Sequence, residues 1–267
     1  MKRILQRPLW FSKRKKHHME DIDFNRRFGG VERLYGQKAL DRFKHSHVCV
    51  IGIGGVGSWV AEALSRNAIG KMTLIDLDHI AESNINRQIQ ALSSTLGKSK
   101  VIAMKERILE INPKCEIDIV DEFISNVNIG TFVTPHFDVV IDAIDQASMK
   151  TSLALHCLKE KIPLVMTGGA GGRIDPSSVK IADLSLTHGD RLTAKIRHDV
   201  KKVLQLKESQ KVGIDVVYTD EVMIKPEGAC EADEALTGLH CGGYGSSVMV
   251  TATFGFMAAS LALKKLL

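Results

Sequence analysis

The chain has 267 residues, 44% of them apolar and only 5% aromatic, which suits one large α/β domain with an aliphatic, parallel-sheet core. Its five cysteines are an odd number without a CxxC pair. They exclude a disulfide framework and a four-cysteine zinc site and favour a reducing cytoplasm. The net charge of +5 is concentrated in residues 1–18, which contain seven basic residues and no acid, whereas the remainder has 29 basic and 31 acidic residues.

We therefore expect a basic N-terminal tail over residues 1–23 and one large domain over residues 24–267. The tail is either a solvated arm or a contact for nucleic acid or an anionic membrane. It lacks the apolar run and the cleavage site of a secretory signal, so the sequence predicts no export. In the following segment, FNRRFGGVERLYGQKALDRF, we expect a break at Gly29-Gly30 and a helix from about Gln37.

Residues 47–78 carry the strongest signal in the chain. An apolar run at 48–51 predicts a buried strand that stops at a glycine-rich turn, and the apolar spacing at 58–69 predicts a helix that ends at Gly70. A second strand at 72–75 then leads to Asp76 and Asp78. Glycines in such a turn let the backbone approach phosphates at a helix N-terminus, and an acid after the second strand binds ribose hydroxyls. A nucleotide site is predicted, with packing alone as the alternative; the turn glycines are Gly52, Gly54, Gly55 and Gly57.

The rest of the chain alternates strands and helices. This order predicts a doubly wound, Rossmann-like, mainly parallel sheet with a C-terminal elaboration from about residue 174. The polar residues 79–90 predict a loop at the carboxyl edge of the sheet, where open α/β folds bind ligands, and residues 227–245 predict a mobile loop. The expected helices span 98–111, 146–159, 191–206 and 246–267, and the expected strands span 115–120, 137–141, 163–166, 179–182 and 215–218.

Charged side chains are expected to converge where these strands end. Each of these side chains, considered alone, can also be explained as a helix cap or as a solvated charge. Together they match adenylation, which needs an acid for ribose, an acid for Mg²⁺ and cations for the charge that spreads over the α-phosphate during attack. The converging residues are Asp76, Asp78, Arg87, Lys100, Asp142 and Asp145.

The motifs GIGGVGS, DLD, SNINRQ, LGKSK and DAIDQ follow one another in this order. Over residues 24 to about 175 the chain resembles the superfamily of ThiF, MoeB and the ubiquitin-activating enzymes, which adenylate carboxylates with ATP. The resemblance implies ATP and Mg²⁺ as cofactors, Asp76 as the ribose-binding acid and Asp145 as the magnesium ligand. It also implies that the phosphates of ATP are contacted by Asn84, Arg87 and Lys100.

The same resemblance implies a homodimer. Arg26 in the sequence FNRR matches the arginine that this superfamily supplies across a dimer interface to the ATP of the partner subunit. Gln146 departs from the superfamily pattern, in which many relatives carry Asn after the metal-binding acid. The catalytic set implied by the resemblance is therefore Arg26, Arg87, Lys100 and Asp145.

A narrower resemblance covers nearly the whole chain. The paired CxxC motifs of ThiF and MoeB are absent, whereas RFGGVERLYG, GGAGGRIDP, ADLSLTHGDRLTAKIRHDVKK and MVTATFGF resemble the tRNA threonylcarbamoyladenosine dehydratases. This branch implies activation of the threonine carboxylate of N6-threonylcarbamoyladenosine beside the tRNA anticodon, followed by cyclisation with net loss of water. The attacking nitrogen belongs to the substrate, so no thioester cysteine is required and proximity supplies much of the rate.

Several interpretations stay open. The branch is associated with a cysteine desulfurase and its sulfur acceptor, so Cys230 and Cys241 are either ordinary thiols or a sulfur relay. The basic helix expected at 191–206 suits a tRNA backbone or is a solvated face. Residues 246–267 are long and apolar enough to cross a membrane, but their small and hydroxyl side chains favour a buried domain helix.

Two other functions compete with the dehydratase. One is ThiF- or MoeB-like adenylation of the C-terminal carboxylate of a sulfur-carrier protein, which the missing zinc cysteines disfavour. The other is an NAD-dependent oxidoreductase that uses the same glycine turn. It leaves the motif SNINRQ and Lys100 unexplained.

Overall fold

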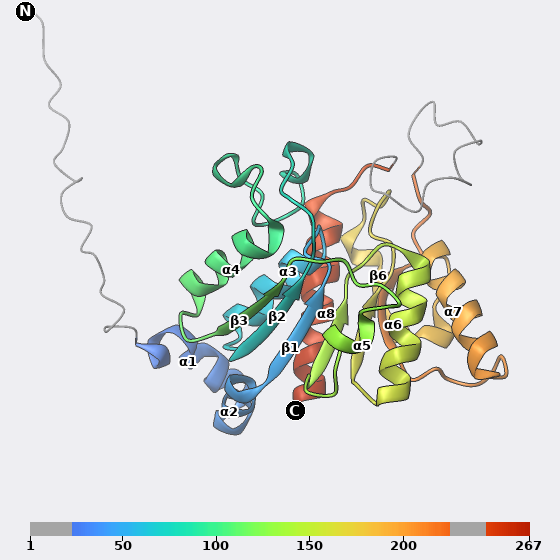
Figure 1. The fold of residues 1–267 in the computed structure, drawn as a ribbon, viewed down its shortest axis with the longest axis horizontal. Helices are drawn as coiled ribbons and strands as arrows, with labels where there is room; N and C mark the ends of the chain where they lie inside the picture. Colours follow the sequence, from blue (N-terminus) through green and yellow to red (C-terminus); the bar gives the residue numbers. More distant parts are fainter. Residues whose placement is uncertain (1–22, 225–243) are drawn as a thin grey trace, which may run out of the picture.

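A seven-stranded sheet in the order β3-β2-β1-β4-β5-β7-β6 forms the centre of the protein (Figure 1). The computed structural model describes residues 23–224 and 244–267, so the basic tail (except Asp23), Cys230, Cys241 and most of the loop expected at 227–245 lie outside the described residues. All neighbouring strands are parallel except β6 and β7, which confirms the predicted doubly wound, mainly parallel sheet. The strands are β1 (His47–Ile51), β2 (Lys71–Ile75), β3 (Glu116–Val120), β4 (Val139–Asp142), β5 (Leu164–Thr167), β6 (Val179–Asp183) and β7 (Asp215–Thr219).

Helices cover both faces of this sheet. One apolar core joins α2, α3, α4 and α8 to one face, and a second joins α5, α6 and α7 to the other. Strand residues alternate between the two cores, as Val48 and Val50 face the first while Cys49 and Ile51 face the second. The helices are α1 (Phe24–Tyr35), α2 (Gln37–His45), α3 (Gly57–Arg66), α4 (Lys100–Ile111), α5 (Ile129–Phe132), α6 (Ala147–Glu160), α7 (Arg191–Leu204) and α8 (Val248–Leu266).

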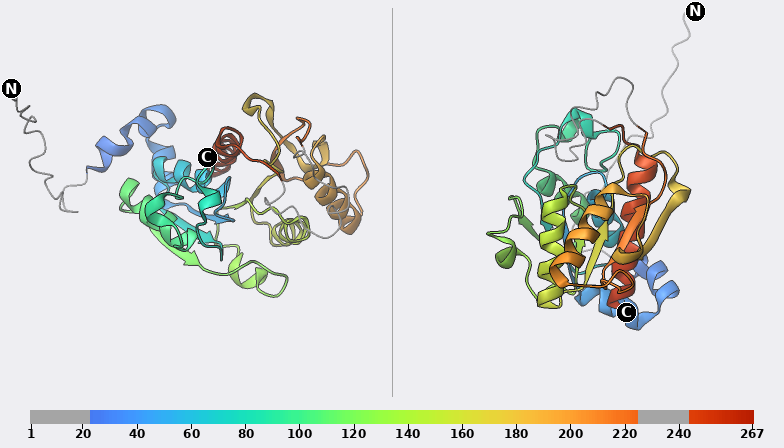
Figure 2. Two further views of the ribbon diagram at one scale, coloured as in Figure 1. Left: turned by 90° about the horizontal axis from the view of Figure 1, so that it is seen from above. Right: turned by 90° about the vertical axis from the view of Figure 1, so that its right-hand side faces the viewer.

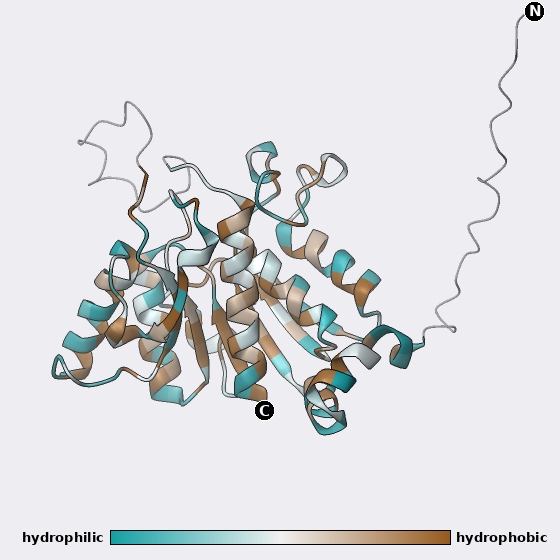
Figure 3. Cartoon of the chain, turned by 180° about the vertical axis from the view of Figure 1, so that it is seen from behind, coloured by the Kyte–Doolittle hydropathy of each residue, from teal (hydrophilic) through white to brown (hydrophobic). Residues whose placement is uncertain are grey.

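Helix α8 runs the full height of the sheet (Figure 2) and lies against its apolar strands (Figure 3). It packs on α3 and on β4, β5 and β7, and Val250, Phe254 and Ala258 are completely buried. At Gly255 a Cβ atom would lie 2.6 Å from the Cβ of Trp59, so the glycine allows α8 to approach α3 closely. Helix α8 has the length and hydropathy of a membrane span, and half of that span is buried. The helix expected at 246–267 is therefore present and packs in the domain.

Two glycine predictions in the first half of the domain are wrong. Helix α1 continues through Gly29 and Gly30 and stops at Gly36, whose φ of 87° favours glycine. Each helical glycine costs about 1 kcal/mol relative to alanine, and here Phe28 offsets this cost by packing with Leu40.

Gly70 does not end α3, because the helix already stops at Arg66. The side chain of Asn67 donates to the carbonyl of Ala63, and the chain turns away at Ala68 with a φ of 62°. Gly70 instead allows close packing, since a Cβ atom there would lie 1.7 Å from the carbonyl oxygen of Lys44.

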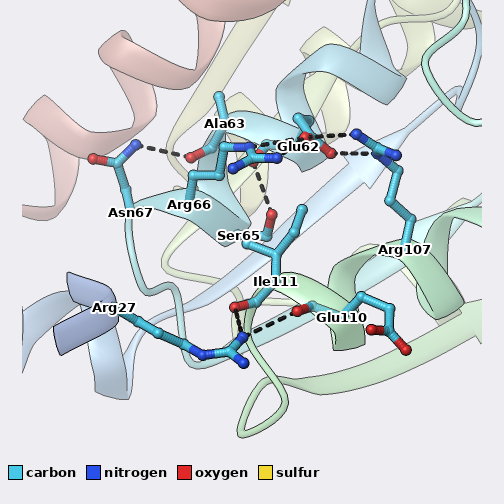
Figure 4. A network of polar contacts seen from close by, with 9 residues as sticks. All are labelled: Arg27, Glu62, Ala63, Ser65, Arg66, Asn67, Arg107, Glu110 and Ile111. Atoms are coloured by element: carbon cyan, nitrogen blue, oxygen red, sulfur yellow. Dashed lines mark hydrogen bonds and ion pairs between the residues drawn. The ribbon is translucent and has the colours of Figure 1, made fainter. Parts of the chain in front are cut away.

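A polar network joins α1, α3 and α4 (Figure 4). The buried carboxylate of Glu62 on α3 accepts hydrogen bonds from Arg66 and from Arg107 on α4, with N···O distances of 2.7–3.0 Å. Arg27 on α1 donates to the carbonyls of Glu110 and Ile111 at 3.0 and 2.8 Å and so caps the C-terminus of α4. Fixing α4 in this way also fixes Lys100, the first residue of that helix.

Candidate functional site

The glycine turn lies at the topological switch point of the sheet. Strand β1 is bordered by β2 on one side and β4 on the other, and open α/β sheets bind ligands in the crevice where the strand order reverses. Gly52 has a φ of 86°, and a Cβ atom on Gly57 would lie 1.8 Å from the carbonyl oxygen of Gly52. A Cβ on Gly52 would lie 2.8 Å from the carbonyl oxygen of Ala143. The turn therefore packs directly on the chain that follows β4.

Asp76 organises this turn from within. One of its carboxylate oxygens accepts the backbone N–H of Ile53 at 2.6 Å, and the other accepts the N–H of Asp78 at 2.8 Å. The side chain is buried, and burial raises the pKa of Asp76 while Lys100 opposes that rise. Both oxygens are thus engaged by the backbone that shapes the site.

Asp78 and Lys100 form an ion pair at the mouth of the site. The Nζ of Lys100 lies 2.6 Å from the Oδ2 of Asp78. The Lys100 side chain is 8% exposed and that of Asp78 is 54% exposed, so the carboxylate faces solvent and the ammonium is held beneath it. Helix α4 presents Lys100 from its first position.

The polar residues after β2 form a loop at the carboxyl edge of the sheet, as the sequence predicts, and Arg87 of this loop lies against the glycine turn. The Oδ1 of Asn84 accepts the N–H of Ala81 at 3.0 Å and closes a short helical turn. The side chain of Arg87 lies against Gly55, where its Cγ and Cδ would be 3.3 Å from an added Cβ, and its Nη1 donates to the carbonyl of Ser83 at 2.6 Å. Arg87 therefore lies beside the glycine turn as a partly exposed cation, and the buried side chain of Asn84 closes the loop that carries Arg87.

Two glutamines that sequence reasoning missed complete this loop. The Nε2 of Gln90 donates to the carbonyl of Ile53 at 2.9 Å and to the Oε1 of Gln88 at 3.2 Å. The Nε2 of Gln88 would be 3.9 Å from a Cβ on Gly54. Both side chains are buried, and the only sequence signal was their position directly after Arg87 in NRQIQ.

The two acids at the end of β4 have different environments: Asp142 is the last, buried residue of the strand, and Asp145 lies three residues later and is exposed. Asp142 is completely buried and forms an ion pair of 2.9 Å with Lys150 of α6, which is also completely buried. Burial raises the pKa of Asp142, and Lys150 opposes that rise. Lys150 further donates to the carbonyl of Ile144 at 3.0 Å, so the pair fixes the loop that carries the exposed Asp145. The expectation that Asp142 converges with the exposed charged groups of the site is wrong, because its side chain is buried in the core, where Lys150 pairs with Oδ1 and Oδ2 has no hydrogen-bond partner among the described residues.

Arg26 is not part of the same cluster within one chain. It is exposed on α1, at the amino edge of the sheet, whereas the glycine turn and the loop after β2 lie at the carboxyl edge (Figure 1).

The basic side chains of helix α7 are largely engaged in contacts within the chain. Lys195 pairs with Asp199 at 3.1 Å, Arg197 donates to the carbonyl of Thr187, and Lys201 pairs with Glu208 at 3.2 Å.

The remaining thiols of the described part are structural. Cys49, Cys115 and Cys157 are unpaired and buried. Burial raises the pKa of Cys115 and of Cys157 to about 12, so neither is a thiolate near neutral pH.

A glycine turn at a switch point, with two acids and two cations around it, defines a nucleotide-binding α/β protein equipped for phosphoryl chemistry. The chain belongs to the ThiF family, whose model matches residues 26–267. This finding confirms the superfamily resemblance drawn from the motifs.

Individual relatives match over almost their full lengths. The tRNA threonylcarbamoyladenosine dehydratase of Escherichia coli is 45% identical over 253 residues, which cover 91% of this chain and 94% of that protein. The enzyme of the same name from Haemophilus influenzae is 45% identical over 252 residues, which cover 93% of this chain and 97% of that protein. The crystal structure of the Escherichia coli enzyme in complex with ATP matches with a TM-score of 0.82 and covers 91% of this chain and 94% of that chain.

A different branch matches less of the chain. The molybdopterin-synthase adenylyltransferase of Escherichia coli is 31% identical over 140 residues, which cover 52% of this chain and 54% of that protein. The alignment with this relative therefore covers about half of this chain.

Proposed function

We propose that this protein is an ATP-dependent enzyme that dehydrates N6-threonylcarbamoyladenosine in tRNA to its cyclic form through activation of the threonine carboxylate. The observation that carries the proposal is the set of charged groups around the glycine turn, in a chain that matches two dehydratases over more than nine-tenths of its length. Adenylation of the sulfur-carrier type is the alternative, supported by similarity over half the chain.

ATP would place its phosphates on the turn of Gly52 to Gly57. Arg87 lies against Gly55 and would contact these phosphates. Lys100 would exchange its contact with Asp78 for a phosphate oxygen, which frees the Asp78 carboxylate. Cations fixed in these positions stabilise the charge that develops when the carboxylate attacks the α-phosphate.

The ribose acid is better assigned to Asp78 than to Asp76. Both oxygens of Asp76 already accept backbone N–H groups, whereas Asp78 is exposed and only one of its oxygens is paired with Lys100. We therefore assign ribose binding to Asp78 and organisation of the turn to Asp76. This differs from the role that the family resemblance implies for Asp76.

Mg²⁺ fits the acid that follows β4. Magnesium is usually held by one or two carboxylates together with substrate phosphates, rather than by a cage of protein ligands. Asp145 is exposed and has no ion pair with another described residue, and no cluster of three potential metal ligands occurs in the part of the chain that the structure describes. The ion would neutralise charge on the phosphates.

A homodimer would complete the site. Helix α1, which carries Arg26, lies at the opposite edge of its own sheet (Figure 1), so Arg26 would reach an ATP that is bound by another subunit. We propose both the dimer and the contribution of Arg26 to the partner's site.

A sulfur-transfer partner is supported by the family association alone, and membrane contact is supported by the apolarity of α8 alone.

The test is direct. Purified protein is incubated with ATP, Mg²⁺ and tRNA that bears the modified adenosine, and the nucleosides are analysed by mass spectrometry. We expect a product lighter by one water, formed only when ATP is present. Unchanged modified nucleoside, together with adenylation of a carrier protein that ends in Gly-Gly, would favour the alternative.

A further inference from the structure

The first glycine turn contains two kinds of glycine. Gly52 and Gly57 are required by the fold, because Gly52 has a positive φ and a Cβ on Gly57 would overlap the carbonyl of Gly52. Gly54 is not required in this way. Its φ is not positive, and the nearest described atom to an added Cβ is 3.9 Å away, an ordinary contact. Where neither packing nor backbone conformation requires glycine, the close approach of a ligand, here a phosphate, explains its presence.

The loop after β5, Gly168 to Gly172, shows the same division. A Cβ on Gly168 would lie 2.2 Å from the Oδ2 of Asp190, and Gly172 has a φ of 68° with Met223 2.6 Å from an added Cβ. Gly169 and Gly171 are partly exposed and have no positive φ. The nearest described atoms to an added Cβ on them are 3.9 and 3.8 Å away. At these two positions, therefore, neither packing among the described residues nor backbone conformation requires glycine.

The loop is held rigidly in place. Asp190, the N-cap of α7, accepts the N–H of Gly169 at 2.8 Å and is buried, which raises the pKa of its carboxyl while the backbone donors oppose that rise. Gly172 donates to the carbonyl of Gly245 at 2.7 Å. The next residue, Ser246, accepts a hydrogen bond of 2.9 Å from Asn86 in the loop over the nucleotide turn. The segment before α8 thus ties the loop after β5 to the loop after β2.

A buried cation at the end of the loop also points to a ligand. Arg173 is 2% exposed, donates through Nη1 to the carbonyl of Glu221, and has a buried Nε–H without a hydrogen-bond partner. Within the described ranges, no carboxylate lies within ion-pair distance of its guanidinium. The guanidinium charge acts on the buried Asp190 carboxylate and opposes the rise of its pKa that burial causes, and the unpartnered Nε–H of Arg173 remains as a donor for an acceptor group of a ligand.

The position of this loop suits an acceptor. Strand β5 is separated from β1 by β4 alone, so the two glycine loops begin about 10 Å apart at the usual strand spacing. The loop that carries Asp145 lies between them. A carboxylate that attacks the α-phosphate has to arrive next to the first loop, and a nucleoside seated on the second loop would direct its substituent there.

We infer that the exposed faces of Gly169 and Gly171 form the subsite for the modified nucleoside of the tRNA, with its carboxylate directed toward the nucleotide turn. This inference rests on the proposed function. It assigns the acceptor to the loop after β5 and separates it from the ATP site at the loop after β1.

Gly169→Val and Gly171→Val test the subsite, with Gly130→Val as the matched control because no described atom lies within 4 Å of a Cβ there. Both subsite variants should raise the KM for modified tRNA by about tenfold or more, the effect of one overpacked contact. Their Kd values for ATP and for tRNA without the modification should stay within about twofold of wild type, whereas Gly54→Val should weaken ATP binding. If a valine variant melts at a lower temperature, the alanine variant at the same position is measured instead.

Each outcome separates the two proposals. If the subsite variants fold and their KM for modified tRNA is unchanged, the subsite is refuted. The proposed function still holds in that case, provided that the wild-type enzyme converts modified tRNA. Loss of ATP affinity, or equal weakening of unmodified tRNA, would also overturn the subsite, because the loop would then contact a different ligand or the tRNA in general. A wild-type enzyme that leaves modified tRNA unchanged would refute the proposed function and the inference with it.

Discussion

Lys150 is the residue whose replacement tests most directly how the core supports the site. In Lys150→Met the buried Asp142 loses its partner at 2.9 Å, and the carbonyl of Ile144 loses a donor at 3.0 Å. Breaking a buried ion pair on one side destabilises a protein by about 3–5 kcal/mol, because the remaining charge stays uncompensated. At roughly 2–4 °C per kcal/mol for a chain of this size, the melting temperature should fall by roughly 10 °C.

The assay is chemical denaturation followed by circular dichroism, in which Lys150→Met is compared with wild type, with Lys159→Met and with the double variant Asp142→Asn/Lys150→Met. Lys159→Met on the same helix is the matched control. Its side chain is 81% exposed, so its stability should change by no more than about 0.5 kcal/mol. Asp142→Asn combined with Lys150→Met should be more stable than Lys150→Met alone, because the unpaired charge is removed.

The pH dependence of Lys150→Met has a definite sign. Burial raises the pKa of Asp142, and loss of Lys150 removes the main opposing influence. A group whose pKa is raised on folding contributes most below its unfolded pKa and loses that contribution as the pH rises through its folded pKa. The stability deficit relative to wild type should therefore shrink as the pH falls from neutrality. A deficit no larger than that of Lys159→Met, or no recovery in the double variant, would refute the reasoning.

Four further predictions concern the site and α8. Asp145→Ala and Arg87→Ala should each lower turnover by about 10²–10³-fold while circular dichroism and melting stay unchanged, by analogy with loss of one transition-state donor; near-normal activity would remove the assignment. Asp76→Asn should cost about 1–3 kcal/mol of stability because one backbone N–H loses its acceptor. Asp78→Asn should mainly weaken ATP binding, measured by calorimetric titration. The reverse pattern would restore Asp76 as the ribose acid. Mixing Arg26→Ala with Asp145→Ala subunits should restore up to one functional site per heterodimer, and no recovery in confirmed heterodimers would place Arg26 in cis or outside the site. A chain that stops at Gly245 should be insoluble or melt much lower, and a folded, active product would show that α8 is dispensable for the core.

The sheet was predictable from sequence because its strands are short apolar runs that stop at glycine or aspartate. This holds for β1, β4 and β5, which lie in the buried middle of the sheet, whereas the edge strand β6 includes Lys180 and has exposed positions. The loop after β2 was predictable because its polarity leaves nothing to bury. The glycine turn was identified from its strand–turn–helix–strand pattern and Asp145 from the family resemblance, and both follow strands that border the switch point.

Other features depend on contacts that no local pattern reveals. Asp142 and Asp145 look equivalent in DAIDQ, and only the packing of Lys150 from the next helix buries one of them. Asp76 and Asp78 are likewise alike in sequence, but the N–H of Ile53, 23 residues earlier in the chain, engages the first of them. Gly29 and Gly30 suggested a break because propensity is local, whereas the packing of Phe28 with Leu40 decides the outcome.

The position of α8 in the chain has a consequence for synthesis. The helix covers β4, β5 and β7 and packs on α3, all of which are made before it. During translation the apolar face of these strands therefore stays open until residues 248–266 have left the ribosome, and the contacts between α3 and α8 close a loop of about 180 residues. Slowing translation between β7 and α8 should increase aggregation more than an equal pause placed after α8.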